Sequence, residues 1–386
     1  VAALSMVAPF SIDTYLPSFP DIQSDLGVGT AAMQQTLSFY LLAFAAGTLM
    51  HGPLSDKFGR RPVILGGLGL YILCSAASAL VADYSILLLL RIGQGLTASA
   101  GLVVGRALVR DVFGGAEAQR VMSRVMLIFA LAPAIAPVVG GILQEISGWR
   151  SVFWFLSGMG TLVWLLAWRT LPETLPPEGR HSIHPAKVTR AYGRAFFHPG
   201  FMAVVFCFSF AFAGMFLYVV GAPRLVFEHL ELGPGDFAYV FVPMVSGVML
   251  GSWLSGRLAE RLGAVRTVNA GFLIMIGAAL LNAGHLYGWP PTVVGVVAPV
   301  ALYAVGMALA LPAMLVLALD YFPRNRGTAA AVQSFVQTTG NALIAGLGVP
   351  LLGGTALMMA SGQLALALTG LLGWWGWRRL AGAAAP

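Results

Sequence analysis

Twelve stretches of mostly apolar residues dominate this sequence, and each is about 20 residues long, which is enough to cross a lipid bilayer as a helix. Inside a bilayer every backbone N–H and C=O group must be bonded within the chain, so stretches of this length fold as helices. The pattern therefore predicts an all-α integral membrane protein with twelve transmembrane helices. The stretches cover residues 1–19, 31–51, 62–82, 85–106, 121–144, 152–170, 199–222, 236–256, 266–286, 292–318, 328–350 and 356–377.

Charged side chains are scarce, which excludes whole classes of protein. They make up 10% of the residues, whereas about a quarter is usual in soluble domains. A water-soluble enzyme could not cover its surface with so few charges, and an apolar content of 58% excludes a disordered chain. Cys74 and Cys207 lie in apolar runs, so we expect packed thiols rather than a disulfide framework. The His residues show no metal-ligand spacing, and we expect no metal ion or other cofactor.

The placement of the basic residues predicts the topology. The formal net charge is +7, and nearly all Lys and Arg residues fall in alternate connections between the stretches. The exceptions are Arg150 and Arg224 in the opposite connections and Arg91 within a stretch. Cytoplasmic connections carry this excess in membrane proteins, so we expect both termini in the cytoplasm and no nucleic-acid partner. Neither Lys57 nor Lys187 is followed by Ser or Thr, which excludes a P-loop ATPase.

The stretches divide into two groups of six. The polar, proline-rich segment 171–198 is predicted to be a cytoplasmic linker between an N-terminal half, 1–170, and a C-terminal half, 199–386. Residues 52–59 and 256–263 share the order Gly-x-Leu-small-acid-base-apolar-Gly, each directly after the second stretch of its half. Two parallel repeats of six helices are one known layout of membrane transporters.

Asp13 and Arg91 are the acid and the base that fall inside predicted membrane helices. Intramembrane charges are costly and usually functional. Each lies about five or six residues from the outer end of its stretch, and a rise of about 1.5 Å per residue puts both at a similar depth. We therefore predict a proton-coupling pair across a wet cavity. The alternatives are that Asp13 only caps a helix end and that Arg91 only bonds backbone carbonyls.

A substrate site is predicted from polar and aromatic residues inside the helices. Gln333, Gln337 and Asn341 lie four residues apart on one helix face, which bonds either a neighbouring helix or a substrate. Phe212 and Phe216 are the members of a phenylalanine-rich stretch that we expect to line a pocket. The predicted substrate-binding residues are Asp13, Tyr15, Gln94, Phe216, Gln337 and Asn341.

Several segments together resemble a known transporter family. They are GPLSDKFGRRPV at 52–63, Arg91–Gly95 in the fourth stretch, Ala132–Gly141 in the fifth, Ser11–Pro20 in the first, and Leu171–Thr174 after the sixth. With these motifs the chain resembles the major facilitator superfamily, and within it the Bcr/CflA drug-resistance subfamily. It departs from the family pattern at Ala132 and Ala136, where glycine is usual, and at Ala264-Val265, where the second repeat lacks the twin arginine.

The resemblance implies the major facilitator fold and proton-coupled multidrug efflux, by alternating access, across the bacterial inner membrane. It implies a monomer that acts on small apolar or amphipathic drug-like substrates and protons, within the lipid bilayer. Gating is assigned to Gly52, Asp56, Lys57, Gly59, Arg60, Arg61, Pro137, Gly140 and Gly141. Asp56 is expected to bond the start of the eleventh helix near Gly327 and to hold the cytoplasmic side closed. The proline and glycines of the fifth helix either permit a bend or only allow close packing.

Other functions remain as alternatives. The same machinery would suit a proton-driven exporter of a small metabolite such as an amino acid or sugar, although a polar substrate should need more intramembrane charge than Asp13 and Arg91. An uncoupled uniporter or receptor is a further alternative, against which the buried acid argues. An enzyme is not expected, because neither a buried Ser–His pair nor a His-Glu-x-x-His motif is present.

Overall fold

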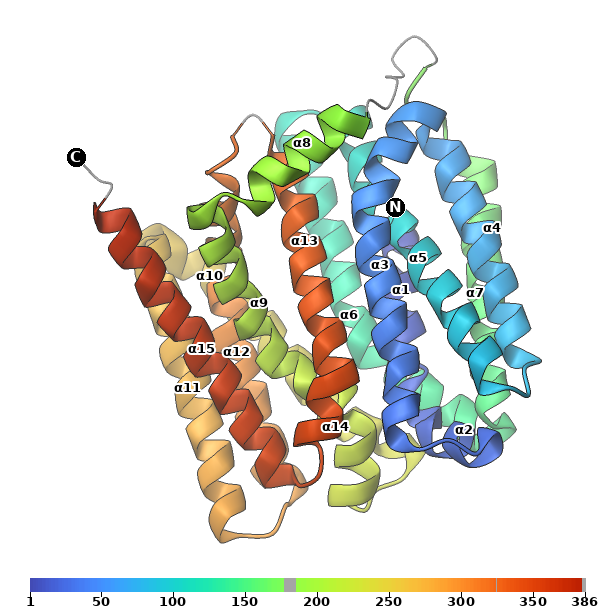
Figure 1. Ribbon diagram of the computed structural model, residues 1–386, viewed down its shortest axis with the longest axis vertical. Coiled ribbons are helices and arrows are strands. Elements are labelled where there is room, and N and C mark those ends of the chain that lie inside the picture. Colours follow the sequence, from blue (N-terminus) through green and yellow to red (C-terminus); the bar gives the residue numbers. More distant parts are fainter. Residues whose placement is uncertain (177–184, 324, 384–386) are drawn as a thin grey trace. The chain divides into compact units, whose positions relative to one another are not determined.

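The computed structural model describes residues 1–176, 185–323 and 325–383, and the regular elements within these ranges are all helices. The chain, drawn in Figure 1, divides into two compact units, Val1–Val188 and Thr189–Pro386. The division falls inside the segment 171–198 that was predicted to be a linker. Part of that segment forms a helix, α8 (Pro185–Phe196), which the sequence analysis did not predict.

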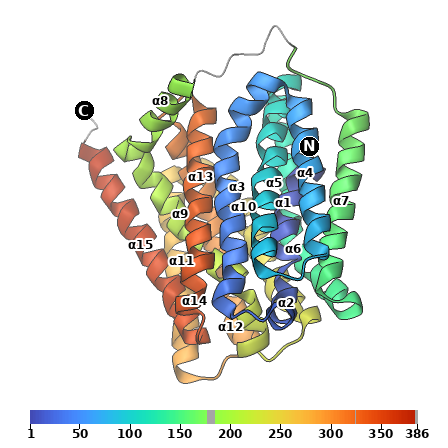
Figure 2. The same ribbon diagram turned by 45° about the vertical axis from the view of Figure 1, so that its right-hand side comes forward.

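Unit 1 is a helical bundle in which α5 has a central place. Helix α5 packs against both α3 and α4, while α4 also packs against α7 and α1 lies between α5 and α6 (Figure 2). Gly95 of α5 faces the backbone of Tyr40 on α3 so closely that a side chain at position 95 would collide with the carbonyl of Tyr40. The helices of this unit are α1 (Ala2–Asp13), η1 (Leu16–Ser18), α2 (Phe19–Leu26), α3 (Thr30–Phe58), α4 (Arg60–Ala79), α5 (Tyr84–Val112), α6 (Gly115–Ser147) and α7 (Trp149–Thr170).

Unit 2 is a second helical bundle. Helix α12 packs against α9, α10 and α11, and α15 packs against α9 and α11. Gly247 and Gly251 of α10 face backbone carbonyls of α12, as expected for small-residue packing between membrane helices. The helices are α9 (Pro199–Val220), η3 (Arg224–His229), η4 (Pro234–Asp236), α10 (Phe237–Leu262), α11 (Ala264–Gly288), α12 (Val293–Leu319), α13 (Arg326–Leu343), η5 (Ile344–Gly348), α14 (Val349–Leu352) and α15 (Ala356–Ala383).

Among the described residues, eleven helical segments are long and apolar enough to cross a membrane, and they correspond to the second to twelfth predicted stretches. The first stretch differs from the prediction of one helix over 1–19, because α1 ends at Asp13 and a short 3₁₀ turn leads into α2. Pro17 and Pro20 explain the break, since proline lacks a backbone N–H and clashes with the preceding helical turn. The eleventh stretch widens into a π-helical turn, η5, just before Pro350, because this proline also lacks a backbone N–H and clashes with the preceding turn.

Candidate functional site

Arg91 is fully buried in α5, and its guanidinium lies between two tyrosine rings. The guanidinium carbon is 4.4 Å from the ring centroid of Tyr15 and 4.4 Å from that of Tyr40. Tyr15 comes from the break after α1, and Tyr40 comes from α3. The negative faces of aromatic rings attract a cation, and more strongly where water is excluded. These contacts hold the charge of Arg91 where three parts of unit 1 meet.

A chain of hydrogen bonds ties Arg91 to α4. Its Nη1 donates to Oε1 of Gln94 at 2.8 Å, and Nε2 of Gln94 donates to Oγ of Ser75 at 2.8 Å. Ser75 in turn donates to the backbone carbonyl of Tyr71 at 2.8 Å, and the hydroxyl of Tyr71 shares a short hydrogen bond with Ser11 of α1. We call this group the Arg91 cluster. Its members are Ser11, Tyr15, Tyr40, Tyr71, Ser75, Arg91 and Gln94.

Two nitrogen atoms of Arg91, Nε and Nη2, have no hydrogen-bond partner among the described residues. A guanidinium carries five N–H donors and always keeps its charge in proteins. An unsatisfied buried donor costs about 1–3 kcal/mol, and more when the group is charged. The cluster is therefore incomplete among the described residues, and Nε and Nη2 of Arg91 can each donate to an acceptor such as a carboxylate or a polar substrate atom.

Asp13 is the last residue of α1, and only 3% of its surface is exposed. Its carboxyl lies within electrostatic reach of Tyr40, the same tyrosine on which Arg91 stacks. No ion pair among the described residues joins Asp13 to Arg91, and no hydrogen bond does so either. The structure thus places both predicted coupling residues, buried, in unit 1, with no hydrogen bond or ion pair between them among the described residues.

The predicted gating connection at 52–61 is a sharp corner rather than a loop. Helix α3 continues to Phe58, a single residue, Gly59, turns the chain, and α4 begins at Arg60. The φ of Gly59 is 98°, a conformation that glycine adopts at little cost. The prediction that the second helix ends near residue 51 is therefore wrong. Gly52 and Lys57 lie within α3, and Lys57 is exposed.

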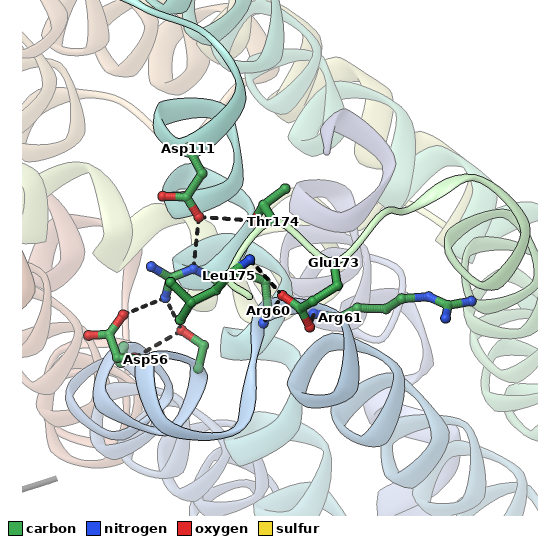
Figure 3. A network of polar contacts seen from close by, with 9 residues as sticks. Asp56, Arg60, Arg61, Asp111, Glu173, Thr174 and Leu175 are labelled. Carbon is green, nitrogen blue, oxygen red and sulfur yellow. Dashed lines mark hydrogen bonds and ion pairs between the residues drawn. The ribbon is translucent and has the colours of Figure 1, made fainter. Parts of the chain in front are cut away.

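Arg60 ties the corner to the end of α5, as Figure 3 shows. Its Nη1 lies 2.6 Å from Oδ1 of Asp56 and donates to Oγ of Ser55 at 2.6 Å, while its Nε lies 3.0 Å from Oδ2 of Asp111. The hydroxyl of Thr174, from the segment after α7, donates to the same oxygen of Asp111 at 3.0 Å. One buried arginine therefore joins the C-terminal ends of α3 and α5.

Glu173 caps the beginning of α4, a role that the sequence analysis did not assign. Its carboxylate accepts backbone hydrogen bonds from Arg60 at 2.9 Å, Arg61 at 3.2 Å and Leu175 at 3.0 Å (Figure 3). A carboxylate is favoured here because the first N–H groups of a helix have no partner within the helix. The helix dipole also gives the N-terminal end of a helix a partial positive charge. Arg61 also donates to the backbone carbonyl of Trp168 in α7 at 2.7 Å. The segment after α7 is thereby fastened to the corner.

Asp56 was expected to bond the start of the eleventh helix near Gly327. Its partner within unit 1 is Arg60, and half of its side chain, 52%, stays exposed. Gly327 lies in the other unit, so the expected bond between the two units stays a prediction. The side chain of Glu260, the counterpart of Asp56 in the second repeat, lies outside the described residues.

The predicted hinge residues lie in α6, which is an unbroken helix from Gly115 to Ser147 despite Pro137. Gly140 faces the break after α1, and a side chain at position 140 would collide with the backbone carbonyl of Thr14. Close packing of α6 against the break thus accounts for Gly140, and Gly141 is also buried. A bending role for these residues stays a prediction.

The substrate-binding residues predicted in the second half lie on two helices of unit 2. Phe216 of α9 is 7% exposed and stacks on Phe212, with ring centroids 5.9 Å apart. On α13, Nε2 of Gln333 donates to Oε1 of Gln337 at 3.1 Å, so these amides bond along their own helix. Asn341 is buried, and its Oδ1 has no partner among the described residues.

Unit 2 contains a second buried polar group, which the sequence analysis missed. Nδ2 of Asn282 donates to the hydroxyl of Tyr218 at 2.8 Å, Tyr303 donates to the carbonyl of Ala211 at 3.0 Å, and Nε2 of Gln363 donates to the carbonyl of Gly214 at 3.3 Å. Oδ1 of Asn282 and Oε1 of Gln363 have no described partner. The Tyr218 cluster, as we call it, consists of Tyr218, Asn282, Tyr303 and Gln363, all at most 1% exposed.

Comparisons with known proteins place the chain among transporters. Residues 1–345 match the sequence profile of the Major Facilitator Superfamily. An uncharacterized MFS-type transporter, YdgK of Bacillus subtilis, is 31% identical over 97% of this chain and 93% of its own length. A bicyclomycin resistance protein homolog of Haemophilus influenzae is 32% identical over 74% of this chain and 73% of its own length. Multidrug resistance protein D of Escherichia coli is 26% identical over 93% of this chain and 89% of its own length.

Solved structures show the same fold. A bacterial homolog of the human lysosomal transporter Spinster superposes with a TM-score of 0.72 over 97% of this chain and 95% of that chain, at 17% identity. The human organic anion transporter MFSD10 gives a TM-score of 0.68 over 97% of both chains, also at 17% identity. At this identity the likeness concerns the fold alone. Within the described ranges, no three His, Cys, Asp or Glu residues lie close enough together to hold a metal ion.

Proposed function

The chain belongs to the major facilitator superfamily, and from this premise we propose that it exports small apolar or amphipathic drug-like molecules across the bacterial inner membrane in exchange for protons. The names of its relatives support the substrate class, since they include bicyclomycin, chloramphenicol and multidrug resistance proteins. Transport by alternating access needs no covalent chemistry, and the proposal assigns none to any residue.

The observation that carries the proposal is the incomplete Arg91 cluster beside a buried acid. Arg91 keeps its charge, and its Nε and Nη2 are unpaired. Asp13 is the last residue of α1, two residues before Tyr15, whose ring Arg91 contacts. An ionised Asp13 is attracted to the free donors of Arg91, whereas a protonated Asp13 is not. Loading and releasing a proton therefore changes how strongly the end of α1 is held to α5.

This change in attraction is our mechanism for coupling. Helix α1 packs against α5 and α6, so a shift at its broken end is transmitted to both. A ligand or proton moves a two-state equilibrium only when it interacts differently with the two states. The Asp13–Arg91 pair supplies such a difference for the proton, and a substrate that contacts Asp13 or Tyr15 supplies one for the drug. Gln94 is bonded at both ends of its amide, and its task is to hold Arg91 in place.

The corner around Arg60 is the proposed cytoplasmic gate. Arg60 and Glu173 fix the corner within unit 1, and the half-exposed Asp56 is the group offered to the other half. We place both termini in the cytoplasm, the two halves at 1–170 and 199–386, and the working unit as a monomer. Phe216, Gln337 and Asn341 are the proposed contribution of the second half to the substrate site.

Inverted membrane vesicles test the proposal. We expect them to accumulate chloramphenicol or ethidium when the interior is acidified, and to lose the accumulation when a protonophore collapses the gradient. The same vesicles with Asp13→Asn serve as the matched control. Accumulation that persists without a proton gradient would contradict proton coupling. Accumulation of amino acids or sugars in place of drugs would favour the metabolite exporter.

A further inference from the structure

Helix α8 has a regular division into an apolar and a basic side. Its apolar residues follow the helical period i, i+3, i+4, i+7, i+8, whereas Arg190 and Arg194 lie one turn apart on another side. Burial follows the same division, since Ala195 is 1% exposed and both arginines are exposed. The apolar positions are Val188, Ala191, Tyr192, Ala195 and Phe196.

The end of α8 is anchored to the rest of unit 2 by aromatic rings. Phe196 meets Phe335 of α13 edge to face at 5.7 Å between ring centroids, and His198 lies 4.8 Å from the ring of Tyr321. Nε1 of Trp377 donates to the hydroxyl of Tyr321 at 2.9 Å. These contacts bring the end of α8 and the C-terminal part of α15 to the same end of the unit, where α8 crosses the helix ends in Figure 1.

Phe197, directly after α8, is a large apolar side chain that is not packed inside the protein. It is 89% exposed although its neighbour Phe196 is packed. Positions 190, 194 and 197 fall on one side of the chain, so the exposed ring lies beside two exposed arginines. An apolar ring is costly in water and favourable at the boundary between headgroups and acyl chains. An exposed phenylalanine in line with arginines is therefore typical of a membrane surface rather than of a solvated face.

Further exposed arginines lie at the same end of unit 2. Arg378 and Arg379 follow Trp377 on α15, and both are exposed. Among the described residues none of the four arginines has an ion-pair partner, and the nearby Asp320 is engaged by Arg326 at 3.1 Å. We call this surface the basic edge; it consists of Arg190, Arg194, Phe197, Arg378 and Arg379.

We propose that the basic edge binds the phosphodiester headgroup of an anionic phospholipid, with the ring of Phe197 inserted beside the acyl chains. Guanidinium groups match phosphate oxygens with paired hydrogen bonds. Basic residues near an anionic lipid surface each contribute about 1 kcal/mol of attraction. This binding is independent of the transport substrate, and it ties the segment between the two units to the bilayer surface.

The test uses the full chain in nanodiscs, with an environment-sensitive fluorophore on Thr189→Cys. Thr189 is exposed, and the native Cys74 and Cys207 are buried, which makes the label selective. Phosphatidylglycerol or phosphatidylcholine with a spin label near the headgroup, at equal mole fraction, quenches the fluorophore in proportion to local enrichment. We expect about 25-fold stronger quenching by the phosphatidylglycerol, because two arginines each favour it by about 1 kcal/mol, or about fivefold.

The variant Arg190→Gln/Arg194→Gln should lose most of this preference. Phe197→Ser should lower quenching by both lipids. The matched control is Arg224→Gln, a base of unit 2 near the other end of α9, which should keep the preference. Equal quenching by the two lipids, or an unchanged preference in the double variant, would overturn the proposal. Loss of the preference on adding excess inorganic phosphate would also overturn it, because the site would then take free phosphate rather than lipid.

Discussion

The Arg91 cluster of unit 1 and the Tyr218 cluster of unit 2 are built on corresponding helices but carry different chemistry. Each joins the first, third and fourth long helices of its repeat: α1, α4 and α5 in one, α9, α11 and α12 in the other. The first contains a permanent charge with unpaired donors, and the second contains only neutral groups with unpaired acceptors. A hydrogen bond between neutral groups holds helices together whether or not a nearby acid is protonated. The attraction of a buried charge to a titratable acid, by contrast, acts only while the acid is ionised. The difference supports our proposal that unit 1 takes up the proton and that unit 2 serves as a scaffold.

The largest effect should come from Asp13→Asn. The amide keeps the shape of the side chain but can no longer take up or release a proton. We expect gradient-driven accumulation of substrate to fall to the background of empty vesicles, while the protein still folds and inserts into the membrane. Transport assays and thermal unfolding on the same preparation check this. A variant that still concentrates substrate against its gradient would show that the proton site lies elsewhere.

Replacing Arg91 should separate transport from stability. A methionine of similar length keeps the packing between Tyr15 and Tyr40 and removes a buried charge with unpaired donors, but it also leaves Oε1 of Gln94 without its donor. Because these two effects on stability oppose each other, we expect Arg91→Met to lose transport while the unfolding temperature changes little. Arg91→Lys should restore transport partly at best, because lysine lacks the planar fork. A strongly lowered unfolding temperature in Arg91→Met would assign Arg91 to the scaffold instead.

A substitution at the proposed cytoplasmic gate should reduce transport less than the substitutions of Asp13 and Arg91. Asp56→Asn should weaken closure of the cytoplasmic side by about 1–3 kcal/mol, the size of one or two charge-assisted hydrogen bonds. This corresponds to a change of about five- to 150-fold in the ratio of the two open states, toward the inward-open one. Distances between spin labels at the cytoplasmic ends of α3 and α13 measure the ratio directly. An unchanged distance distribution with normal transport would leave Asp56 as part of a topology signal.

The Tyr218 cluster should show the opposite behaviour to Arg91. Asn282→Leu leaves the hydroxyl of Tyr218 without its partner in a fully buried place. We expect unfolding to become easier by about 1–3 kcal/mol, with proton coupling retained in the protein that remains folded. Thermal unfolding and the ratio of protons to substrate in vesicles check both parts. Loss of coupling at unchanged stability would contradict the division of labour between the two units.

The sequence predicted those features that depend on local composition. Eleven of the apolar stretches became the long helices, because a bilayer leaves the backbone no other choice. Asp13 and Arg91 were found because a charge in an apolar run is conspicuous. Asn282 and Gln363 were not, because a single neutral amide in such a run gives no sign of its partner on another helix. Glu173 belonged to a noted motif, but its contact with α4 depends on folding across more than a hundred residues of chain.

Two local features were also missed, for physical reasons. The second helix was predicted to end near residue 51, yet α3 continues through Pro53 to Phe58 and the turn uses one glycine, Gly59. Helix α8 was not predicted because the prolines around it favour a linker, although its apolar residues from Val188 to Phe196 follow the helical period. In both cases the local sequence was compatible with two structures, and the contacts of Arg60 and Phe196 with distant residues decided between them.

The smallest effect is expected at Glu173. Glu173→Ala removes the acceptor of two N–H groups at the start of α4, and the loss of such a cap costs about 1 kcal/mol. Because the cap also fixes the backbone of Arg60, the ion pair between Arg60 and Asp111 should loosen, and closure of the gate should weaken by less than in Asp56→Asn. Glu173→Gln should keep most of the function, since its amide oxygen still accepts a hydrogen bond. Spin-label distances as for Asp56→Asn, together with amide hydrogen exchange at the start of α4, measure both consequences.

The matched control is Thr174→Val, which removes one bond to Asp111 and leaves the cap intact. Unchanged exchange at Arg60 and Arg61 in Glu173→Ala would show that the cap does not hold this corner.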